Sequence, residues 1–136
     1  MNMTLKTVGV TAAIIVGMAA QPVVAHHSFS AEFDIARPVK VAGKVSSVRW
    51  SNPHAWIYID VTGEDGKVVN WAFETATANA LFRRGWRKDD LLPGTAVTAE
   101  GWRARNGTPT ANTSAITLPD GRRLFTGNAP NEGTSR

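Results

Sequence analysis

Three Asn-Gly or Asp-Gly pairs, at residues 65–66, 106–107 and 120–121, lie between runs in which apolar and polar residues alternate. Such pairs supply the positive φ angles of tight hairpin turns, and alternation is typical of strands with one buried face. The strands on either side of each pair are therefore expected to be antiparallel neighbours. The pattern predicts five strands, at residues 39–50, 55–62, 67–75, 95–105 and 110–118, with room for a short sixth at residues 122–125.

One helical stretch separates the third strand from the fourth. Thr77 is a suitable N-cap, residues 78–84 form the body, and Gly85 can end the helix. Leu81 and Phe82 are expected to plug a barrel. Three strands, a helix and further strands follow the order of an OB-type barrel. We predict a mainly β fold, a small OB-like antiparallel barrel of five to six strands with one short helix, and keep a split β-sandwich as the alternative.

The first 25 residues have the three parts of a secretory signal peptide. Lys6 precedes an apolar run at residues 8–20, and a small residue, Ala25, ends the segment. The run of thirteen residues falls short of the roughly 20 that a membrane-spanning helix needs. We therefore predict cleavage between Ala25 and His26, a periplasmic or secreted mature protein, and membrane contact only through the uncleaved signal peptide.

Composition limits what the remaining chain can do. Removing 25 of the 136 residues leaves 111, enough for one small domain, which we place at residues 26–127. The chain contains no Cys, so disulfides cannot stabilise it. The excess of 14 basic over 11 acidic residues is mild, so we expect Arg49 and the other basic residues to be ordinary surface charge and expect no nucleic-acid partner. Residues 128–136, rich in Gly, Asn, Ser and Thr, are predicted to be disordered.

Several short sequence words occur in a fixed order along the chain. They are HHSF at 26–29, WSNPHAW at 50–56, NWAFE at 70–74, RRGW at 83–86 and LPDGR at 118–122. Together they resemble the bacterial exported proteins of the domain-of-unknown-function family 6152. The resemblance implies an exported small β domain and carries no assigned reaction or ligand.

The three histidines of the chain fall in two places. His26 and His27 stand at the predicted new amino terminus, and His54 stands in the loop before the second strand. Cleavage would give His26 an α-amino nitrogen beside its imidazole, and a set of nitrogen ligands suits Cu(II). We hypothesise that copper or another divalent metal binds through His26, His27 and His54. The alternative is that His54 only holds a turn and that the histidine pair is a flexible end.

A second candidate site is aromatic. The alternation of the second strand places Trp56 and Tyr58 on the face opposite its apolar residues. Trp50 ends the first strand, and Asn52 stands in the loop before the second. In OB-type barrels this face commonly binds ligands. The alternative function is therefore a metal-free periplasmic binding module for a small molecule, a glycan or a protein.

Signatures of catalysis are mostly missing from the sequence. It has no phosphate-binding glycine loop, no Gly-x-Ser-x-Gly and no His-Glu-x-x-His. Ser51 precedes His54 by three residues, but no carboxylate is placed by the sequence to orient the imidazole. We therefore expect a non-catalytic domain, with copper as its one candidate cofactor, and keep a hydrolase as a remote alternative.

Overall fold

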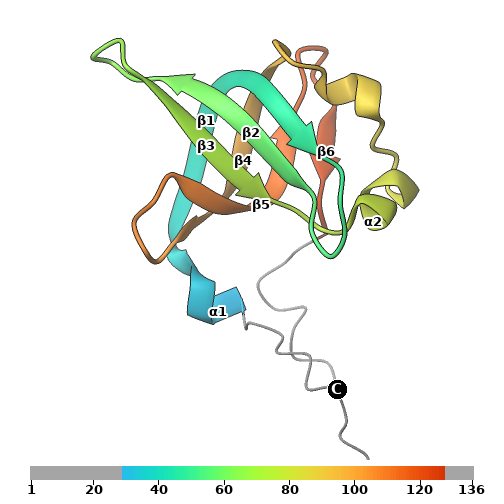
Figure 1. Cartoon of the computed structure of the whole chain (residues 1–136), viewed down its shortest axis with the longest axis horizontal. Helices are drawn as coiled ribbons and strands as arrows, with labels where there is room; N and C mark the ends of the chain where they lie inside the picture. The colour runs from blue at the N-terminus through green and yellow to red at the C-terminus, as the bar shows by residue number, and fades with distance from the viewer. Residues whose placement is uncertain (1–28, 128–136) are drawn as a thin grey trace, which may run out of the picture.

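One long strand, β1 (Phe33–Arg49), organises the fold (Figure 1). The computed structural model of the chain describes residues 29–127. β1 is antiparallel to two neighbours, because its first part pairs with β4 (Ala96–Ala104) and its last part with β2 (Trp56–Thr62). The strand order is β3-β2-β1-β4-β5-β6, in which the remaining strands are β3 (Val68–Glu74), β5 (Thr110–Thr117) and β6 (Arg123–Phe125).

A parallel pairing between β3 and β5 joins the two halves of the sheet into a ring. We call this contact the seam. It consists of Ala72 opposite Thr110, Phe73 opposite Ala111 and Glu74 opposite Asn112. The seam is short, so the barrel closes only in part. The prediction of a mainly β, OB-like antiparallel barrel with a short helix after the third strand is confirmed.

The hairpin turns lie where the glycine pairs predict them. Gly66, Gly107 and Gly121 have φ angles of 78°, 79° and 85°, a region that glycine enters without steric cost. They turn β2 into β3, β4 into β5 and β5 into β6, and each of these pairs is antiparallel. The last five strands begin and end within one residue of their predicted bounds.

The amino-terminal end of the barrel differs from the prediction. β1 begins at Phe33 rather than at residue 39, and a short helix, α1 (Phe29–Glu32), precedes it. The pairing of β1 with β4 shifts register between Phe33 and Pro38. Proline has no N–H to donate to a ladder, and this irregular stretch lacks the alternation that marks a strand in sequence.

The predicted helix is α2 (Ala78–Arg83). The Thr77 hydroxyl accepts a hydrogen bond from the backbone N–H of Ala80 at 3.1 Å, as an N-cap does. Gly85, with a φ of 95°, follows the end of the helix. A single turn of 3₁₀ helix, η1 (Lys88–Leu91), comes next. It was not predicted, because one turn is too short to show helical periodicity.

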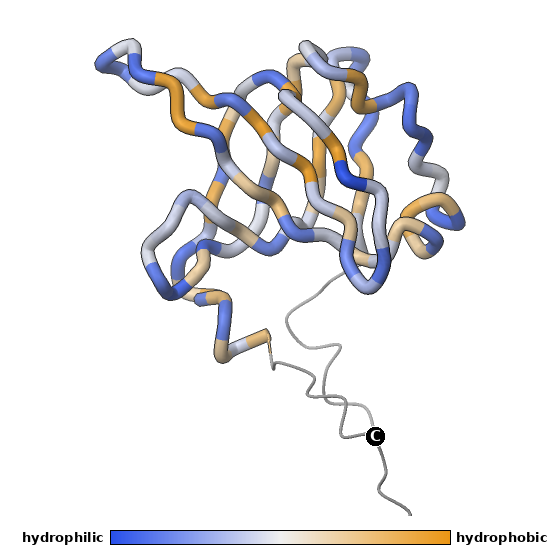
Figure 2. Tube along the Cα trace, viewed as in Figure 1, coloured by the Kyte–Doolittle hydropathy of each residue, from blue (hydrophilic) through white to orange (hydrophobic). Residues whose placement is uncertain are grey.

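Apolar positions that alternate along the strands form the core (Figure 2). Leu81 joins it as expected and is fully buried. Phe82 does not plug the barrel: its ring is half-buried and stacks on Trp50, with the ring centroids 5.1 Å apart. Successive helix positions point about 100° apart, so Leu81 and Phe82 cannot face the same core. The largest fully buried side chains include Trp86, Phe73, Ile57, Ile59 and Ile116.

Within residues 29–127, no helix is both long enough and apolar enough to cross a membrane. The predicted signal peptide at residues 1–25, the cleavage site between Ala25 and His26, His27, and the predicted disordered tail at residues 128–136 lie outside the described residues. These expectations therefore stay predictions.

Candidate functional site

His54 lies in the loop between β1 and β2, and backbone hydrogen bonds hold the end of that loop against the end of β3. The N–H of Thr75 donates to the carbonyl of Ala55 at 2.9 Å, and the N–H of Ala55 donates to the carbonyl of Ala76 at 3.0 Å. The imidazole Nδ1 of His54 lies 3.0 Å from the Thr75 carbonyl oxygen. The loop thus holds the His54 ring at a fixed place beside β3.

This contact decides the tautomer of His54. A carbonyl oxygen can only accept a hydrogen bond, so Nδ1 carries the proton. In the neutral ring Nε2 then keeps its lone pair, and 48% of the side chain is exposed. A backbone carbonyl on one ring nitrogen is the usual support of a histidine that binds a metal through the other.

Glu74 is the second acceptor beside His54, and its Oε1 lies 3.3 Å from the same Nδ1. The Glu74 side chain is 11% exposed. Burial raises the pKa of its carboxyl, the proximity of His54 opposes that rise, and Glu32 of α1 adds to it. This pair was not predicted from the sequence. The Asp65-Gly66 turn sets the register that places Glu74 opposite Trp56, and that register is the signal that would have revealed it.

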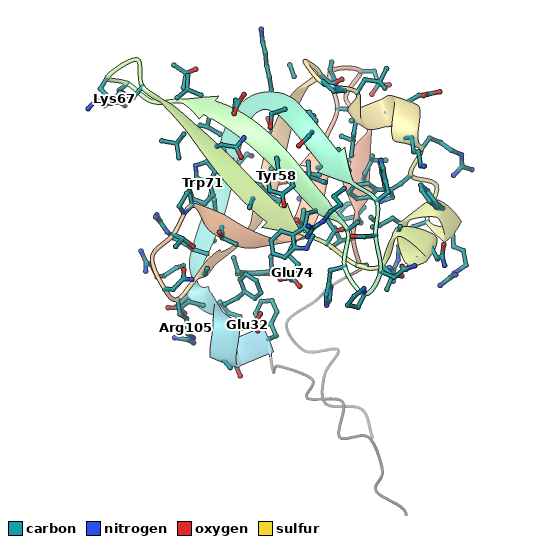
Figure 3. All side chains as sticks on the ribbon, in the orientation of Figure 1. Glu32, Tyr58, Lys67, Trp71, Glu74 and Arg105 are labelled. Atoms are coloured by element: carbon teal, nitrogen blue, oxygen red, sulfur yellow. The ribbon has the colours of Figure 1, made fainter. Side chains whose placement is uncertain are left out.

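Glu74 belongs to a line of side chains that crosses the strands on the outer surface of the barrel. We call it the outer row. Register alone defines it, because each member lies opposite the next on a neighbouring strand: Arg49, Trp56, Glu74, Asn112 and Trp102. Figure 3 shows Glu74 between Tyr58 and Glu32.

One end of the outer row is covered by α1. The ring of Phe29 packs edge-on against Trp102, with the centroids 5.6 Å apart. Glu74 and Asn112 are both buried, although they stand on the outer face. Within residues 29–127, the buried Oδ1 atom of Asn112 has no hydrogen-bond partner. The far end of the row, at Arg49 and Trp56, stays accessible.

Two of the four predicted ligand-binding residues line a common hollow, and the other two do not. Asn52 and Trp56 line a hollow of about 340 Å³, which we call the loop hollow; its walls are Arg49, Ser51, Asn52, Pro53, His54 and Trp56. Tyr58 is half-buried on the outer face of β2 and does not line this hollow. Trp50 packs against the core and on Phe82. The structure thus brings Asn52 and Trp56 together with His54.

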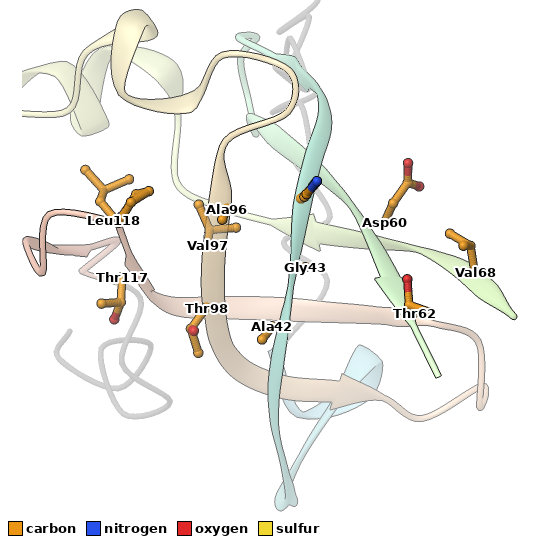
Figure 4. Close-up of a pocket in the computed structure, with 12 residues that line it drawn as sticks. Ala42, Gly43, Asp60, Thr62, Val68, Ala96, Val97, Thr98, Thr117 and Leu118 are labelled. Atoms are coloured by element: carbon orange, nitrogen blue, oxygen red, sulfur yellow. The ribbon is translucent and has the colours of Figure 1, made fainter. Parts of the chain in front are cut away.

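A larger hollow of about 710 Å³ shares no lining residue with the loop hollow (Figure 4). Small side chains such as Ala42, Ala96 and Thr98 form much of its wall, and its charged members are Lys44 and Asp60. This larger hollow was not predicted from the sequence. None of the candidate residues from the sequence lines it.

The comparisons with known proteins give one match. A family model described as a family of unknown function, DUF6152, matches residues 13–113. The chain belongs to the DUF6152 family. In this DUF6152 chain the match spans His26, His27, His54 and Glu74. No curated protein and no solved structure matches the chain.

Ser51 of the DUF6152 chain donates its hydroxyl hydrogen bond to the backbone carbonyl of His54, at 2.7 Å. The hydroxyl proton is therefore directed at the backbone rather than at the imidazole. Glu74 supplies a carboxylate beside His54. A hydrolytic triad also needs a nucleophile that is hydrogen-bonded to the imidazole, and the Ser51 hydroxyl bonds to the backbone instead.

Of the three predicted metal ligands of the DUF6152 chain, only His54 lies within the described residues. Among residues 29–127, no three His, Cys, Asp or Glu side chains gather into a metal-binding group. His54 is the described member of the predicted set. His26 and His27 precede Phe29 in the sequence and lie outside the described residues.

Proposed function

We propose that this DUF6152 protein is an exported, non-catalytic binding domain that holds a divalent metal, Cu(II) first, through His54, His26 and His27. The observation that carries the proposal is the hydrogen bond from His54 Nδ1 to the Thr75 carbonyl at 3.0 Å. It fixes the ring and leaves Nε2 as the ligand atom on an accessible side chain.

The position of α1 supports the participation of the histidine pair. Phe29 packs on Trp102, and two steps along the outer row lead from Trp102 to Glu74, which contacts His54. Neighbouring strands lie about 4.8 Å apart, so these two steps cover about 10 Å. The chain from His26 to Phe29 can itself span about 10 Å. The pair is therefore tethered within reach of the outer row.

The chemistry of the ligands favours copper. Cleavage after Ala25 would give His26 an amine and an imidazole on one residue, and His27 and His54 would add imidazole nitrogens. Nitrogen ligands suit Cu(II), which lies at the top of the affinity order for divalent metals. Glu74 would not bind the metal in this arrangement. Its carboxylate would instead make the His54 ring a better electron donor from the Nδ1 side.

The test is a Cu(II) titration of protein that has been exported, processed and recovered from cells, with mass spectrometry to locate its first residue. We expect one copper per chain, a visible absorption band and a higher melting temperature. His54→Ala should weaken copper binding, whereas Thr62→Ala, an exposed position on β2, should leave it unchanged.

A chain with one extra Met before His26 is the matched control for the amine. It keeps every side chain but moves the free amine away from His26, so its affinity should fall. Unchanged spectra and melting temperature in the processed chain at stoichiometric copper would overturn the proposal. A first residue other than His26 would overturn the role of the amine.

A further inference from the structure

We propose that the loop hollow, whose wall includes His54, also binds a small carboxylate with a planar, aromatic body. The site does not require a metal, and it lies at the accessible end of the outer row. Its walls hold one cation, one indole and one exposed amide: Arg49, Trp56 and Asn52. A volume of about 340 Å³ is at the small end of the range for ligand pockets.

Arg49 supplies the charge. Within the described part of the chain, the guanidinium of Arg49 forms neither an ion pair nor a hydrogen bond. Other arginines form ion pairs or donate to backbone carbonyls: Arg105, Arg122 and Arg123 do the first, and Arg84, Arg87 and Arg103 do the second. The loop hollow also has no acidic side chain in its wall. A guanidinium offers a planar fork of donors that matches the two oxygens of a carboxylate. The fork matches a phosphate as well, and the small volume of the hollow favours the smaller anion, a carboxylate.

Trp56 supplies the shape. It lies directly opposite Arg49 in the β1–β2 ladder, and side chains so placed are close neighbours on one face. The half-buried side chain of Trp56 forms part of the wall of the hollow that Arg49 also lines. An aromatic ring attached to the carboxylate can pack against this wall, whereas acetate cannot. Asn52 is exposed at the rim, where its amide can bond to polar groups of the ligand.

The experiment uses the purified protein in EDTA, so that it is independent of the metal. Benzoate is the probe, benzamide is the uncharged analogue, and acetate is the analogue without a ring. The signal is the indole N–H resonance of Trp56 in ¹H–¹⁵N spectra. We expect saturable movement of this resonance with benzoate, and binding weaker by about tenfold or more with either analogue.

Two arginine variants make the result specific. Arg49→Gln should weaken benzoate binding by about tenfold, the order expected for losing a charge-assisted bidentate pair. Arg37→Gln removes the same charge from an exposed position on the same strand and should leave binding unchanged.

Equal effects of the two variants, equal binding of benzamide or acetate, or no saturable change with benzoate would each overturn the proposal. None of these outcomes bears on the copper titration. Failure of copper binding would likewise leave the carboxylate site standing.

Discussion

Nδ1 of His54 lies between two acceptors, 3.0 Å from the carbonyl oxygen of Thr75 and 3.3 Å from Oε1 of Glu74. The carbonyl fixes the tautomer, and the carboxyl adds negative charge when it is ionised. A loop residue is thereby oriented by the end of β3. The same carboxyl lies at the seam that closes the barrel, so a substitution of Glu74 tests the stability of the fold as well as the proposed metal site.

Glu74→Gln is expected to weaken Cu(II) binding by about tenfold without abolishing it, because supporting groups of metal-binding histidines have effects of this order. Isothermal titration of the processed chain measures the affinity. Asp60→Asn, the same type of change at an exposed position on β2, is the control and should match the wild-type protein. An identical affinity for all three chains would show that Glu74 does not support the ring.

Without metal, Glu74 should make the fold less stable as the pH rises. Burial raises the pKa of Glu74 in the folded protein above its ordinary value of 4.5. The nearby His54 lowers this pKa, and the negative charge of Glu32 raises it further. Below pH 4.5 the carboxyl is protonated in both states. As the pH rises, the unfolded chain loses the proton first, so folding loses stability until the folded pKa has been passed.

Urea unfolding of the wild-type protein and Glu74→Gln between pH 4 and pH 8 measures this effect, because glutamine cannot ionise. The stability of the wild-type protein relative to the variant should fall across that interval. A difference that stays constant with pH would contradict the expected direction.

Leu81→Ala should cost about 2–5 kcal/mol of unfolding free energy, because Leu81 is fully buried and its truncation leaves a cavity. Leu92→Ala is the matched control. Leu92 is 54% exposed, and its truncation should change stability by no more than about 0.5 kcal/mol. Urea denaturation of both variants makes the comparison. Similar losses would mean that α2 does not anchor the core through Leu81.

Gly101→Ala should destabilise the barrel by about 1–3 kcal/mol, as overpacking of a tight interior commonly does. A Cβ at Gly101 would collide with the backbone carbonyl of Asn112 on the neighbouring strand. Gly63→Ala is the control, because a Cβ there would lie 2.9 Å from an oxygen of the exposed Asp65 side chain and at an ordinary contact distance of 3.6 Å from the Lys67 carbonyl. Thermal unfolding compares the two variants, and equal melting temperatures would refute the close approach.

The local features of the fold could be predicted from the sequence. The turns were predictable because few residues other than glycine adopt positive φ angles, as Gly66, Gly107 and Gly121 do. The start of α2 was predictable because the Thr77 hydroxyl caps its first turn. The order of these elements indicated the barrel. α1 gave no such signal, because it is a single turn followed by a proline-containing strand with a register shift.

The site was harder to predict because its parts are distant in sequence. The candidates His54, Trp56 and Asn52 follow from residue type and alternation, and the structure brings them to one hollow. The role of Glu74 depends on the strand register and on the backbone bonds between Thr75 and Ala55. The Asp65-Gly66 turn indicates the register, but the backbone bonds join segments that are distant in sequence and leave no local signal.

Because the seam is short, the backbone amides of the barrel should exchange with deuterium at two different rates. The β2–β3 hairpin extends beyond the three residue pairs of the seam, and Val68 and Val69 near its end are 60% and 44% exposed (Figure 1). Its outer amides can therefore open without separating β3 from β5. Phe73, within the seam and fully buried, should exchange only when the whole ring opens. Slower exchange at Phe73 after a ligand is added would then report stabilisation of the whole barrel.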